Sequence, residues 1–317
     1  MTGRSTGPDR PRPSYRDLPE GNARGVFGAD DQLGCLNLLT PDRTAAAAKL
    51  VRTGQVFSLN GSLTHYNVPN FFAGTGIGRG APKHTVFAIG KAKIRREDYL
   101  DGFYPQAGSQ WDHFRHCGDP VTGTFYNGHT DETCGIHAWA ERGIAGRGVL
   151  LDVARYLVSR GDPIDWLSPR EITVADLEET AAAQGVVVTE GTILLLRVGW
   201  QEGYAKLSAE ERVALPTSNP PAPGLEASKP MAERLWDWGI AAIGSDNPGL
   251  ESYLPGRPST LHDDLLGRLG IPIGEFWLLD DLAARCAAEG RHEFLFTSAP
   301  LNVAGGVGST ANALAIQ

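Results

Sequence analysis

Cysteine is scarce in this 317-residue sequence: the four thiols, Cys35, Cys117, Cys134 and Cys286, form no CxxC pair and no dense cluster. Such spacing does not support a disulfide framework, so it indicates reduced thiols and favours a cytoplasmic protein. Long apolar runs are absent too, because no window approaches the roughly 18 consecutive apolar residues that a membrane-spanning helix requires. These absences predict a protein without a membrane partner.

Positive charge is also in deficit. The sequence has 29 lysines and arginines against 37 aspartates and glutamates, and its formal net charge of −8 is spread along the chain. A protein that binds nucleic acid usually carries a basic face. The charge therefore predicts no nucleic-acid partner.

The first 24 residues are rich in proline, arginine, aspartate and glycine and lack the apolar core of a secretory signal, which predicts a flexible arm. From residue 25 to residue 317 the composition is globular, with no internal repeat and no linker, so we expect one domain. Within it, residues 64–108 are rich in glycine, proline and asparagine and contain only short strand-like pieces such as HTVFAIG. Long irregular connections of this kind are often functional.

Helix and strand signals alternate along the domain. Thr40 and Pro41 start a helix that Gly54 should end, and Thr173 with Asp176 forms a capping box that starts another. The segment GTILLLRVGW is apolar nearly throughout, as expected for a strand buried on both faces of a sheet. Three further helix-then-strand pairs follow it. The alternation predicts an α/β fold.

A dense group of polar and aromatic side chains lies in the stretch GSQWDHFRHCGD, residues 108–119. If this stretch is helical, Asp112 and His116 share one face because they are four residues apart, and Gln110 or His113 can border the same site. Carboxylate and imidazole groups suit zinc or manganese, and an amide oxygen is a weaker ligand. Because such pairs are common by chance, an ordinary polar cluster is the alternative.

A second group lies far along the chain. His262 stands at the head of a predicted helix, and Glu275 follows in IPIGEFW, whose apolar residues predict burial. A buried carboxylate is costly unless it is paired or bound to a metal ion. Glu275 is therefore either half of a buried salt bridge or a metal ligand, and His262 is either a ligand or a capping residue.

These stretches resemble the putative cyclase family of metal-dependent hydrolases, whose members include bacterial kynurenine formamidase and isatin hydrolase. The family signature HxGTHxDxPxH is similar to QAGSQWDHFRH, in which Gly108, Ser109, Asp112 and His116 fall on the family's Gly, Thr, Asp and last His. The segments DDQLGCLNLLTP, LLLRVGW and TSAPLNVAGGVGS extend the resemblance over most of the chain from about residue 25.

The second half of the chain also resembles the family, because the later His and Glu of the family fall on His262 and Glu275, beside GIPIGE. The signature itself differs at three positions. Gln106 and Gln110 replace its two early histidines, and Phe114 replaces its proline. Since two neutral amides bind zinc less well than two imidazoles, the chain resembles a distinct branch of the family.

The resemblance implies a swivelling β/β/α domain, with a sheet or partial barrel flanked by helices, assembled as a homodimer or homotetramer. It also implies one divalent metal ion, manganese or zinc, in a hydrolase that opens a carbon–nitrogen bond of an amide or cyclic amide in a small-molecule substrate. The residues that would bind the metal are Gln106, Gln110, Asp112, His262 and Glu275.

The same resemblance implies that His116 is the general base and acid, with Glu275 as the second catalytic group. Trp111 and Phe114 would line a pocket for an aromatic or heterocyclic substrate. Simple packing in the core is the alternative for both rings.

Two other functions stay open. One is a lyase or cyclase that acts on an aromatic or polyketide-like compound, and the other is a small-molecule binding protein that has lost its metal, as the two glutamines suggest. His129 and His137 could supply the missing imidazoles, although loop and core histidines are more common. A nucleophile at Cys117 or Cys134 is disfavoured, because neighbours along a chain rarely point at one another.

Overall fold

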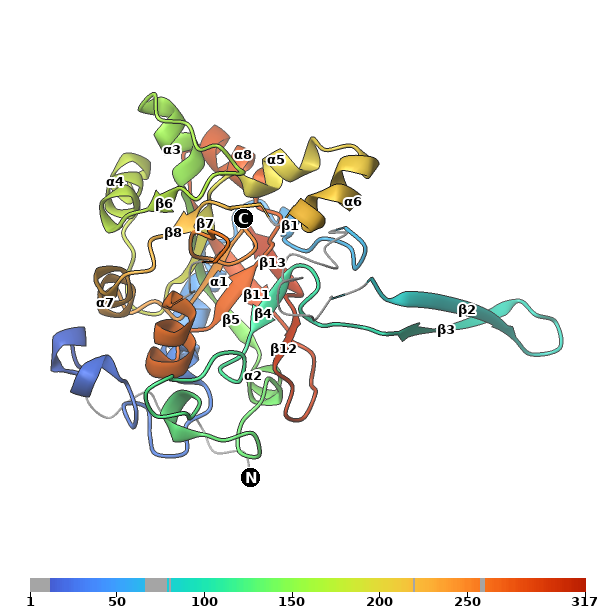
Figure 1. Ribbon diagram of the computed structural model, residues 1–317, viewed down its shortest axis with the longest axis horizontal. Coiled ribbons are helices and arrows are strands. Elements are labelled where there is room, and N and C mark those ends of the chain that lie inside the picture. Colours follow the sequence, from blue (N-terminus) through green and yellow to red (C-terminus); the bar gives the residue numbers. More distant parts are fainter. Residues whose placement is uncertain (1–11, 66–78, 80, 219, 257–259) are drawn as a thin grey trace.

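The computed structural model describes residues 12–65, 79, 81–218, 220–256 and 260–317, and it has an α/β fold (Figure 1). Its centre is a curled nine-stranded sheet, a half-barrel flanked by helices, with the strand order β1-β13-β11-β5-β7-β9-β10-β4-β12. The predicted α/β class, with a sheet or partial barrel flanked by helices, is confirmed.

Four parallel strands form the middle of this sheet. They are β5 (Ile144–Asp152), β7 (Ile193–Arg197), β9 (Ala242–Ser245) and β10 (Ile273–Glu275). β7 is buried along its whole length, as its uninterrupted apolar run predicts. Because parallel strands share one direction, their last residues lie along the same edge of the sheet.

Antiparallel strands complete the sheet on both sides. On one side lie β11 (Glu293–Ser298), β13 (Ala313–Ile316) and β1 (Val56–Ser58), and on the other lie β4 (Gln110–Asp112) and β12 (Gly308–Thr310). β4 pairs with both β10 and β12, so segments far apart in the sequence meet there. A separate parallel pair consists of β6 (Glu171–Ile172) and β8 (Gly224–Leu225).

Helices alternate with the central strands, as predicted, and α3, α4 and α7 form a row along one flank of the sheet (Figure 1). None of the described helices is long and apolar enough to span a membrane. The α-helices are α1 (Pro41–Ala48), α2 (His137–Arg142), α3 (Val153–Ser159), α4 (Val174–Gln184), α5 (Trp200–Ala205), α6 (Ala209–Ser218), α7 (Lys229–Asp237) and α8 (Asp280–Glu289). Among the residues that the structure describes, the other helical segments are the 3₁₀ turns Tyr15–Asp17, Pro19–Gly21, Gly34–Leu38 and Tyr126–Gly128 and the π-helix Asp263–Leu269.

Helix ends test the sequence signals directly. The capping box of Thr173 and Asp176 starts α4, and Gly185 ends it in the left-handed conformation, both as predicted. Thr40 caps α1 as predicted, but the expected end at Gly54 is wrong, because the helix stops at Ala48. The backbone N–H groups of residues 53 and 54 instead donate to the carbonyl of Gln317, at 3.1 and 2.7 Å, which draws this segment towards the sheet.

The predicted flexible arm over residues 1–24 is wrong for its described part. Tyr15 and Leu18 are buried, and Trp236 Nε1 donates to the carbonyl of Pro13 at 2.9 Å. The guanidinium of Arg12 lies 4.5 Å from the centre of the Trp236 ring. Aromatic burial and this cation–π contact outweigh the polar composition of the segment. Residues 1–11 lie outside the described residues.

A β-hairpin projects from the body of the molecule (Figure 1). It consists of β2 (Lys83–Ile89) and β3 (Arg95–Asp101), which pair antiparallel in a sheet of their own. The hairpin lies within residues 64–108, where the strand-like piece HTVFAIG is confirmed as β2, whereas β3 was not predicted. Strand-forming residues such as those of HTVFAIG outweigh the glycines and prolines around them.

Candidate metal centre

Two neighbouring strands carry most of the candidate centre. β4 and β10 pair antiparallel, with Gln110 opposite Glu275 and Asp112 opposite Ile273. Residues opposite one another on antiparallel strands point to the same face of the sheet. The side chains of Gln110, Asp112 and Glu275 therefore share one face. His262 reaches it from the residue that precedes the π-helix.

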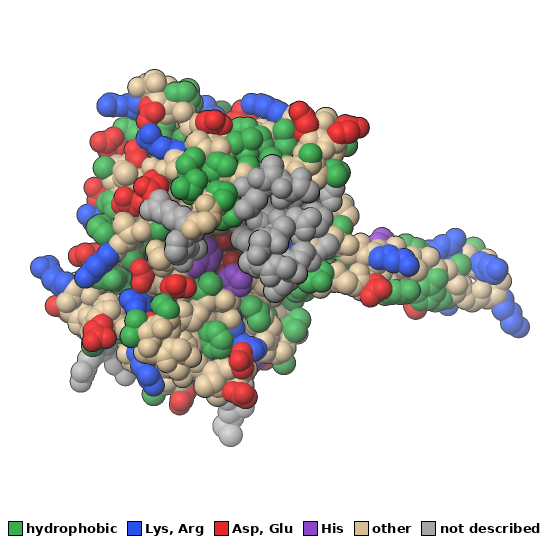
Figure 2. Space-filling model, in the orientation of Figure 1, with side chains coloured by type: hydrophobic (Ala, Val, Ile, Leu, Met, Phe, Trp, Pro, Cys, Tyr) green, Lys and Arg blue, Asp and Glu red, His purple; other side chains and the backbone are tan. Residues whose placement is uncertain are grey.

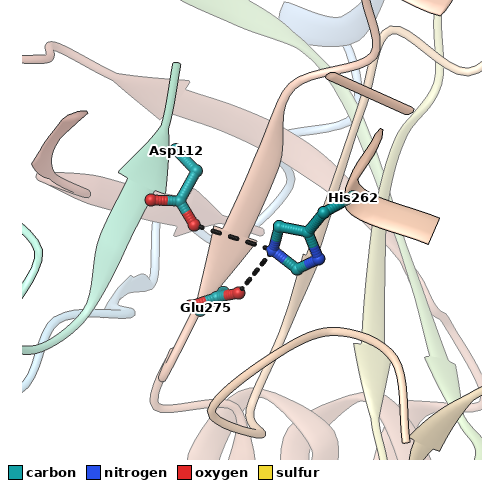
Figure 3. A group of neighbouring side chains, drawn as sticks. All are labelled: Asp112, His262 and Glu275. Atoms are coloured by element: carbon teal, nitrogen blue, oxygen red, sulfur yellow. Dashed lines mark hydrogen bonds and ion pairs between the residues drawn. The ribbon is translucent and has the colours of Figure 1, made fainter. Parts of the chain in front are cut away.

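Asp112, His262 and Glu275 meet in a buried cluster (Figure 3). One ligand atom of each lies within 4.8 Å of the others. His262 Nε2 is 3.1 Å from Glu275 Oε1 and 4.0 Å from Asp112 Oδ2. The structure thus brings together the two groups that lie far apart in the sequence.

Gln110 joins the cluster through its amide. Nε2 donates to Asp112 Oδ1 and Oδ2, at 3.1 Å each, and to Glu275 Oε2 at 2.9 Å. The other amide atom, Oε1, is buried and has no hydrogen-bond partner within the described part of the chain. A buried acceptor without a partner is costly. Turning the amide over would direct this oxygen at a cation between the two carboxylates, so the residues present fit a divalent metal ion.

The charges in the cluster are not balanced by its own groups. Burial raises the pKa of Glu275 to about 7, and the nearby charge of Asp112 adds to this effect. Burial alone would lower the pKa of His262, but the carboxylates of Glu251 and Glu275 outweigh it and raise that pKa well above its usual value. Three buried carboxylates thus lie around one imidazole, and a metal cation would offset their mutual repulsion.

Glu251 is a member of the site that the sequence analysis missed. Its Oε2 lies 2.6 Å from His262 Nδ1, and its Oε1 lies 3.4 Å from the backbone N–H of His262. This contact leaves Nε2 of His262 to face Asp112 and Glu275. Metal-binding histidines usually place their second ring nitrogen against a carboxylate in this way. This rule predicts that a carboxylate accompanies His262, but the residue types of the segment LESY do not identify Glu251 as that carboxylate.

Two non-glycine residues beside the acids have left-handed backbone conformations. Leu250, with φ 53°, precedes Glu251, and Phe276, with φ 56°, follows Glu275. Such conformations cost about 1–3 kcal/mol each and persist only where surrounding contacts maintain them. Ser109 provides one such contact, because its hydroxyl donates to the Phe276 carbonyl at 2.6 Å. The backbone is therefore strained at the residues next to the two glutamates that contact His262.

Gln106 and His116 border the cluster. The amide nitrogen of Gln106 donates to Asp112 Oδ1 and lies 3.3 Å from His116 Nδ1. Asp112 favours the charged form of His116, but burial and the positive charges of His262 and Arg79 outweigh it and lower the pKa of His116. A neutral imidazole at neutral pH can accept a proton from a reacting group. His116 is only partly buried, and histidine side chains are visible in a hollow of the face shown in Figure 2.

The segment from Gly108 to His116 is not helical, so the condition for a shared helix face of Asp112 and His116 is not met. Residues 110–112 form β4, and a turn follows in which the His116 N–H donates to the His113 carbonyl at 2.7 Å. His113 does not border the site, because its ring packs against Phe114 and Trp139 and burial lowers its pKa to about 3.

Trp111 and Phe114 pack in the core, so the predicted pocket walls are wrong. Successive residues of a strand point to opposite faces, and Trp111 therefore points away from Gln110 and Asp112. Its ring lies edge-on to Trp277, with centroids 4.8 Å apart, and Nε1 donates to Ser298 at 2.9 Å. The Phe114 ring packs against Tyr126 and Trp139, at 4.7 and 5.0 Å.

The remaining candidates lie outside the cluster. His129 Nε2 contacts the carbonyl of Asp31 at 2.9 Å, and His137 Nδ1 accepts the N–H of Gly305 at 3.3 Å, so both histidines support loops. Burial raises the pKa of the Cys117 thiol to about 12 and that of Cys134 to about 11. Neither thiol is poised to ionise, in agreement with the low weight given to a cysteine nucleophile.

The curled sheet and the buried cluster define an α/β protein with a candidate metal centre. A family model described as putative cyclase matches residues 57–252. A crystal structure described as a novel cyclase is 32% identical in sequence, with a TM-score of 0.79, and the match covers 93% of this chain and 99% of the other. The chain belongs to the putative cyclase family.

More distant structures share the fold. An isatin hydrolase bound to the product analogue thioisatinate is 17% identical, with a TM-score of 0.56, over 84% of this chain and 93% of that chain. Isatin hydrolase A from Labrenzia aggregata is 15% identical, with a TM-score of 0.55, over 86% of this chain and 96% of that chain. A search of curated proteins gave no match.

Proposed function

We propose that this protein is a metal-dependent hydrolase that opens a carbon–nitrogen bond of an amide or cyclic amide. The observation that carries the proposal is the buried cluster of Asp112, His262 and Glu275, in which carboxylates outnumber the cationic groups and Gln110 Oε1 has no partner among the described residues. Three charged side chains would not be buried together in a pocket that had lost its purpose, because each costs free energy to desolvate.

One manganese or zinc ion would be held by Asp112, His262 and Glu275, with Gln110 Oε1 and, on the border, Gln106 as further oxygen ligands. When bound, such an ion lowers the pKa of water and polarises a carbonyl group. Glu251 keeps the Nε2 atom of His262 directed at the centre by occupying Nδ1.

His116 is the proposed general base and acid. Turning the Gln106 amide over would let its oxygen accept from Nδ1–H, which leaves Nε2 of the neutral ring free to exchange a proton with the substrate. In hydrolysis His116 would remove a proton from the attacking water and return it to the leaving nitrogen. Glu275 is the second proposed catalytic group, and it would act as a ligand of the ion, whose positive charge favours the ionised carboxylate.

The similar structures support hydrolysis as the reaction class, because two of them are named isatin hydrolases. The relative with 32% identity is described as a cyclase, and this favours ring closure as a second candidate reaction on an aromatic or polyketide-like compound. The mass of the product separates the two: hydrolysis adds one water to the substrate, whereas dehydrative cyclisation removes one.

The proposal is tested by elemental metal analysis of the protein purified without chelator, together with Asp112→Ala and His262→Ala. A matched control exists on the hairpin, where His84 Nε2 and Asp98 Oδ2 form an exposed pair at 2.7 Å. We expect near-stoichiometric metal in the parent and in His84→Ala and Asp98→Ala, and none in the two site variants. Far-UV circular dichroism confirms that all variants are folded.

No metal in the parent, even after incubation with manganese or zinc, would overturn the proposal and favour a binding protein without metal. If metal is present, a panel of amides and lactams is incubated with the protein and the products are weighed by mass spectrometry. Ring-opened products that are heavier by one water support hydrolysis, and lighter products favour the cyclase.

A further inference from the structure

Arg79 brings a positive charge to the border of the metal centre. Its Nη1 donates to the backbone carbonyl of Gln106 at 2.6 Å. The side-chain amide of the same Gln106 contacts Asp112 and His116. A single residue thus lies between the guanidinium and the centre. Neither the metal binding nor the proton transfer proposed above uses Arg79, so its place beside the centre requires another explanation.

The electrostatics of the site agree with this placement. Burial raises the pKa of Glu275, and the charge of Arg79 acts against that effect. The pKa of His116, which Asp112 and burial affect most strongly, is lowered by the same guanidinium. Charges near a protein surface act strongly on one another only over short distances. The guanidinium therefore lies close to the proposed ligand Glu275 and to the proposed base His116.

The contact with Gln106 leaves the chemistry of the guanidinium intact. A backbone carbonyl is neutral, so this hydrogen bond does not cancel the charge of Arg79. A guanidinium has five N–H donors in a planar fork, which matches the two oxygens of a carboxylate. It can therefore hold the carbonyl and a carboxylate at the same time. Arg79 is only partly buried, so a small molecule in the site can reach it.

We infer that the substrate carries a carboxylate group near its amide, and that Arg79 binds this carboxylate and thereby determines specificity. The inference rests on the proposed function and adds the substrate class, an anionic amide or cyclic amide. The carboxylate lies beside Gln106, while the carbon–nitrogen bond faces the metal ligands and His116. Because one residue spans the two positions, one small molecule can occupy both.

A purely structural Arg79 would behave differently. An arginine that only offset the carboxylates of the cluster, or only held Gln106 in place, would affect anionic and neutral ligands alike when it is replaced. An arginine that binds the carboxylate of the substrate affects the anionic ligand far more. The ratio of the two affinities therefore separates these roles.

The test compares two substitutions at Arg79 with a matched control. Arg79→Gln removes the charge but keeps an amide N–H that can donate to the Gln106 carbonyl, and Arg79→Lys keeps the charge without the fork. The control is Arg291→Gln, because Arg291 also donates to a backbone carbonyl, that of Leu50 at 2.8 Å. The probes are meta-acetylbenzoate and meta-methylacetophenone, two ketones without a carbon–nitrogen bond that differ only in a carboxylate or a methyl group.

Calorimetry measures the binding of both probes to the full-length protein incubated with manganese. We expect the parent and the control to bind the benzoate about 10- to 100-fold more tightly than the methyl compound. Arg79→Gln should lose most of this preference, and Arg79→Lys should keep part of it. Equal binding of the two probes to the parent, no binding of either, or a preference that is unchanged in Arg79→Gln would each overturn the inference.

Turnover of the matching amides, meta-acetamidobenzoate and meta-methylacetanilide, keeps this inference separate from the proposed reaction. Arg79→Gln should raise KM for the benzoate about 10- to 100-fold with little change in kcat, since a carboxylate is bound equally in the ground state and the transition state. Hydrolysis of both amides with no preference would overturn the role of Arg79 and leave the hydrolase. A preference in binding without hydrolysis of any amide would count against the hydrolase and leave the anion site.

Discussion

Acidic side chains are buried in two regions along the same edge of the sheet. In the first, Asp152 ends β5, and Asp246 directly follows β9. In the second, Glu275 ends β10, beside Asp112 and Glu251. Both regions thus use the ends of neighbouring strands, yet the chain balances their charge in different ways.

Arg197, the last residue of β7, supplies the cation of the first region. Its guanidinium contacts Asp152 at 2.9 Å, Asp280 at 2.7 Å and Glu202 at 2.7 Å. Burial alone would lower the pKa of Arg197, but the surrounding carboxylates outweigh it and raise that pKa above its usual value. Asp246 accepts the backbone N–H groups of residues 198, 199 and 201 at 2.7, 2.9 and 3.3 Å.

The second region has an imidazole where the first has a guanidinium. His262 is the ion-pair partner of Asp112, Glu251 and Glu275, and it can lose its proton, which Arg197 cannot. In the first region the cation is a permanent part of the chain, as expected of a structural network. In the second region the carboxylates outnumber the cationic side chains, as expected of a site that binds a metal cation.

The largest effect is expected at Arg197. Arg197→Met leaves Asp152 buried without its inner cation and should lower the free energy of unfolding by about 3–5 kcal/mol. Arg155→Met is the control, because Arg155 also contacts Asp152, at 3.0 Å, but has a side chain that is 56% exposed. It should lose less than about 1 kcal/mol. Urea unfolding measures both variants, and equal losses would contradict a structural role for Arg197.

Metal should stabilise the second region only. Manganese or zinc at 100 times its dissociation constant should add about 2.7 kcal/mol to the free energy of unfolding of the parent. A chelator should remove this gain, seen as a drop of several degrees in the thermal midpoint. Glu275→Gln should show neither response, and Arg155→Met should show both. If the chelator lowers the midpoint of Glu275→Gln as well, the cation binds elsewhere.

Glu251 sharpens the comparison, because it would act on the metal only through His262. Glu251→Ala should weaken zinc binding about 10- to 100-fold, as measured by calorimetry. Glu251→Gln keeps an acceptor oxygen for His262 Nδ1 and should restore part of this affinity. Ser252→Ala is the control, since its hydroxyl donates to the Pro169 carbonyl, away from the centre. Unchanged affinity in Glu251→Ala would show that Glu251 does not orient His262.

The smallest effect concerns pH and the first region. Burial raises the pKa of Asp246 from its ordinary 3.8 to about 6, although the charge of Arg197 opposes this. An acid whose pKa is raised on folding contributes stability below its unfolded pKa and loses it as the pH rises through its folded pKa. The stability of the parent relative to Asp246→Asn should therefore fall between about pH 4 and about pH 6. Urea unfolding across this range tests it, and parallel profiles would refute it.

Parts of the site were predictable where local sequence carries the physical cause. The apolar neighbours in IPIGEFW predict the burial of Glu275, and the structure confirms it, with 3% of the residue exposed. That Asp112 lies beside His262 and Glu275 could be predicted only from the family resemblance, because spacing along the sequence does not show which distant segments form adjacent strands.

The wrong predictions, and the failure to predict Glu251, have physical reasons as well. The stretch QWD supports a helix or a strand equally, and only the strand puts Trp111 on the opposite face from Gln110 and Asp112. Glu251 lies in a loop, where an acid is usually solvated, and only its contact with His262 distinguishes it. The N-terminal segment has polar composition, yet the burial of Tyr15 fixes it to the body.

Gly308 has no Cβ atom, and this limits the substitutions that the site can accept. Gly308 lies opposite Asp112 on β12, and a Cβ there would lie 2.5 Å from Cγ of Gln106. Alanine at 308 is therefore incompatible with Gln106 as it lies, and the backbone oxygen of Trp111, 2.7 Å from the same Cβ, would oppose it whatever residue stands at 106. An imidazole at position 106 would also carry a Cγ atom, so it needs glycine at 308 as much as Gln106 does.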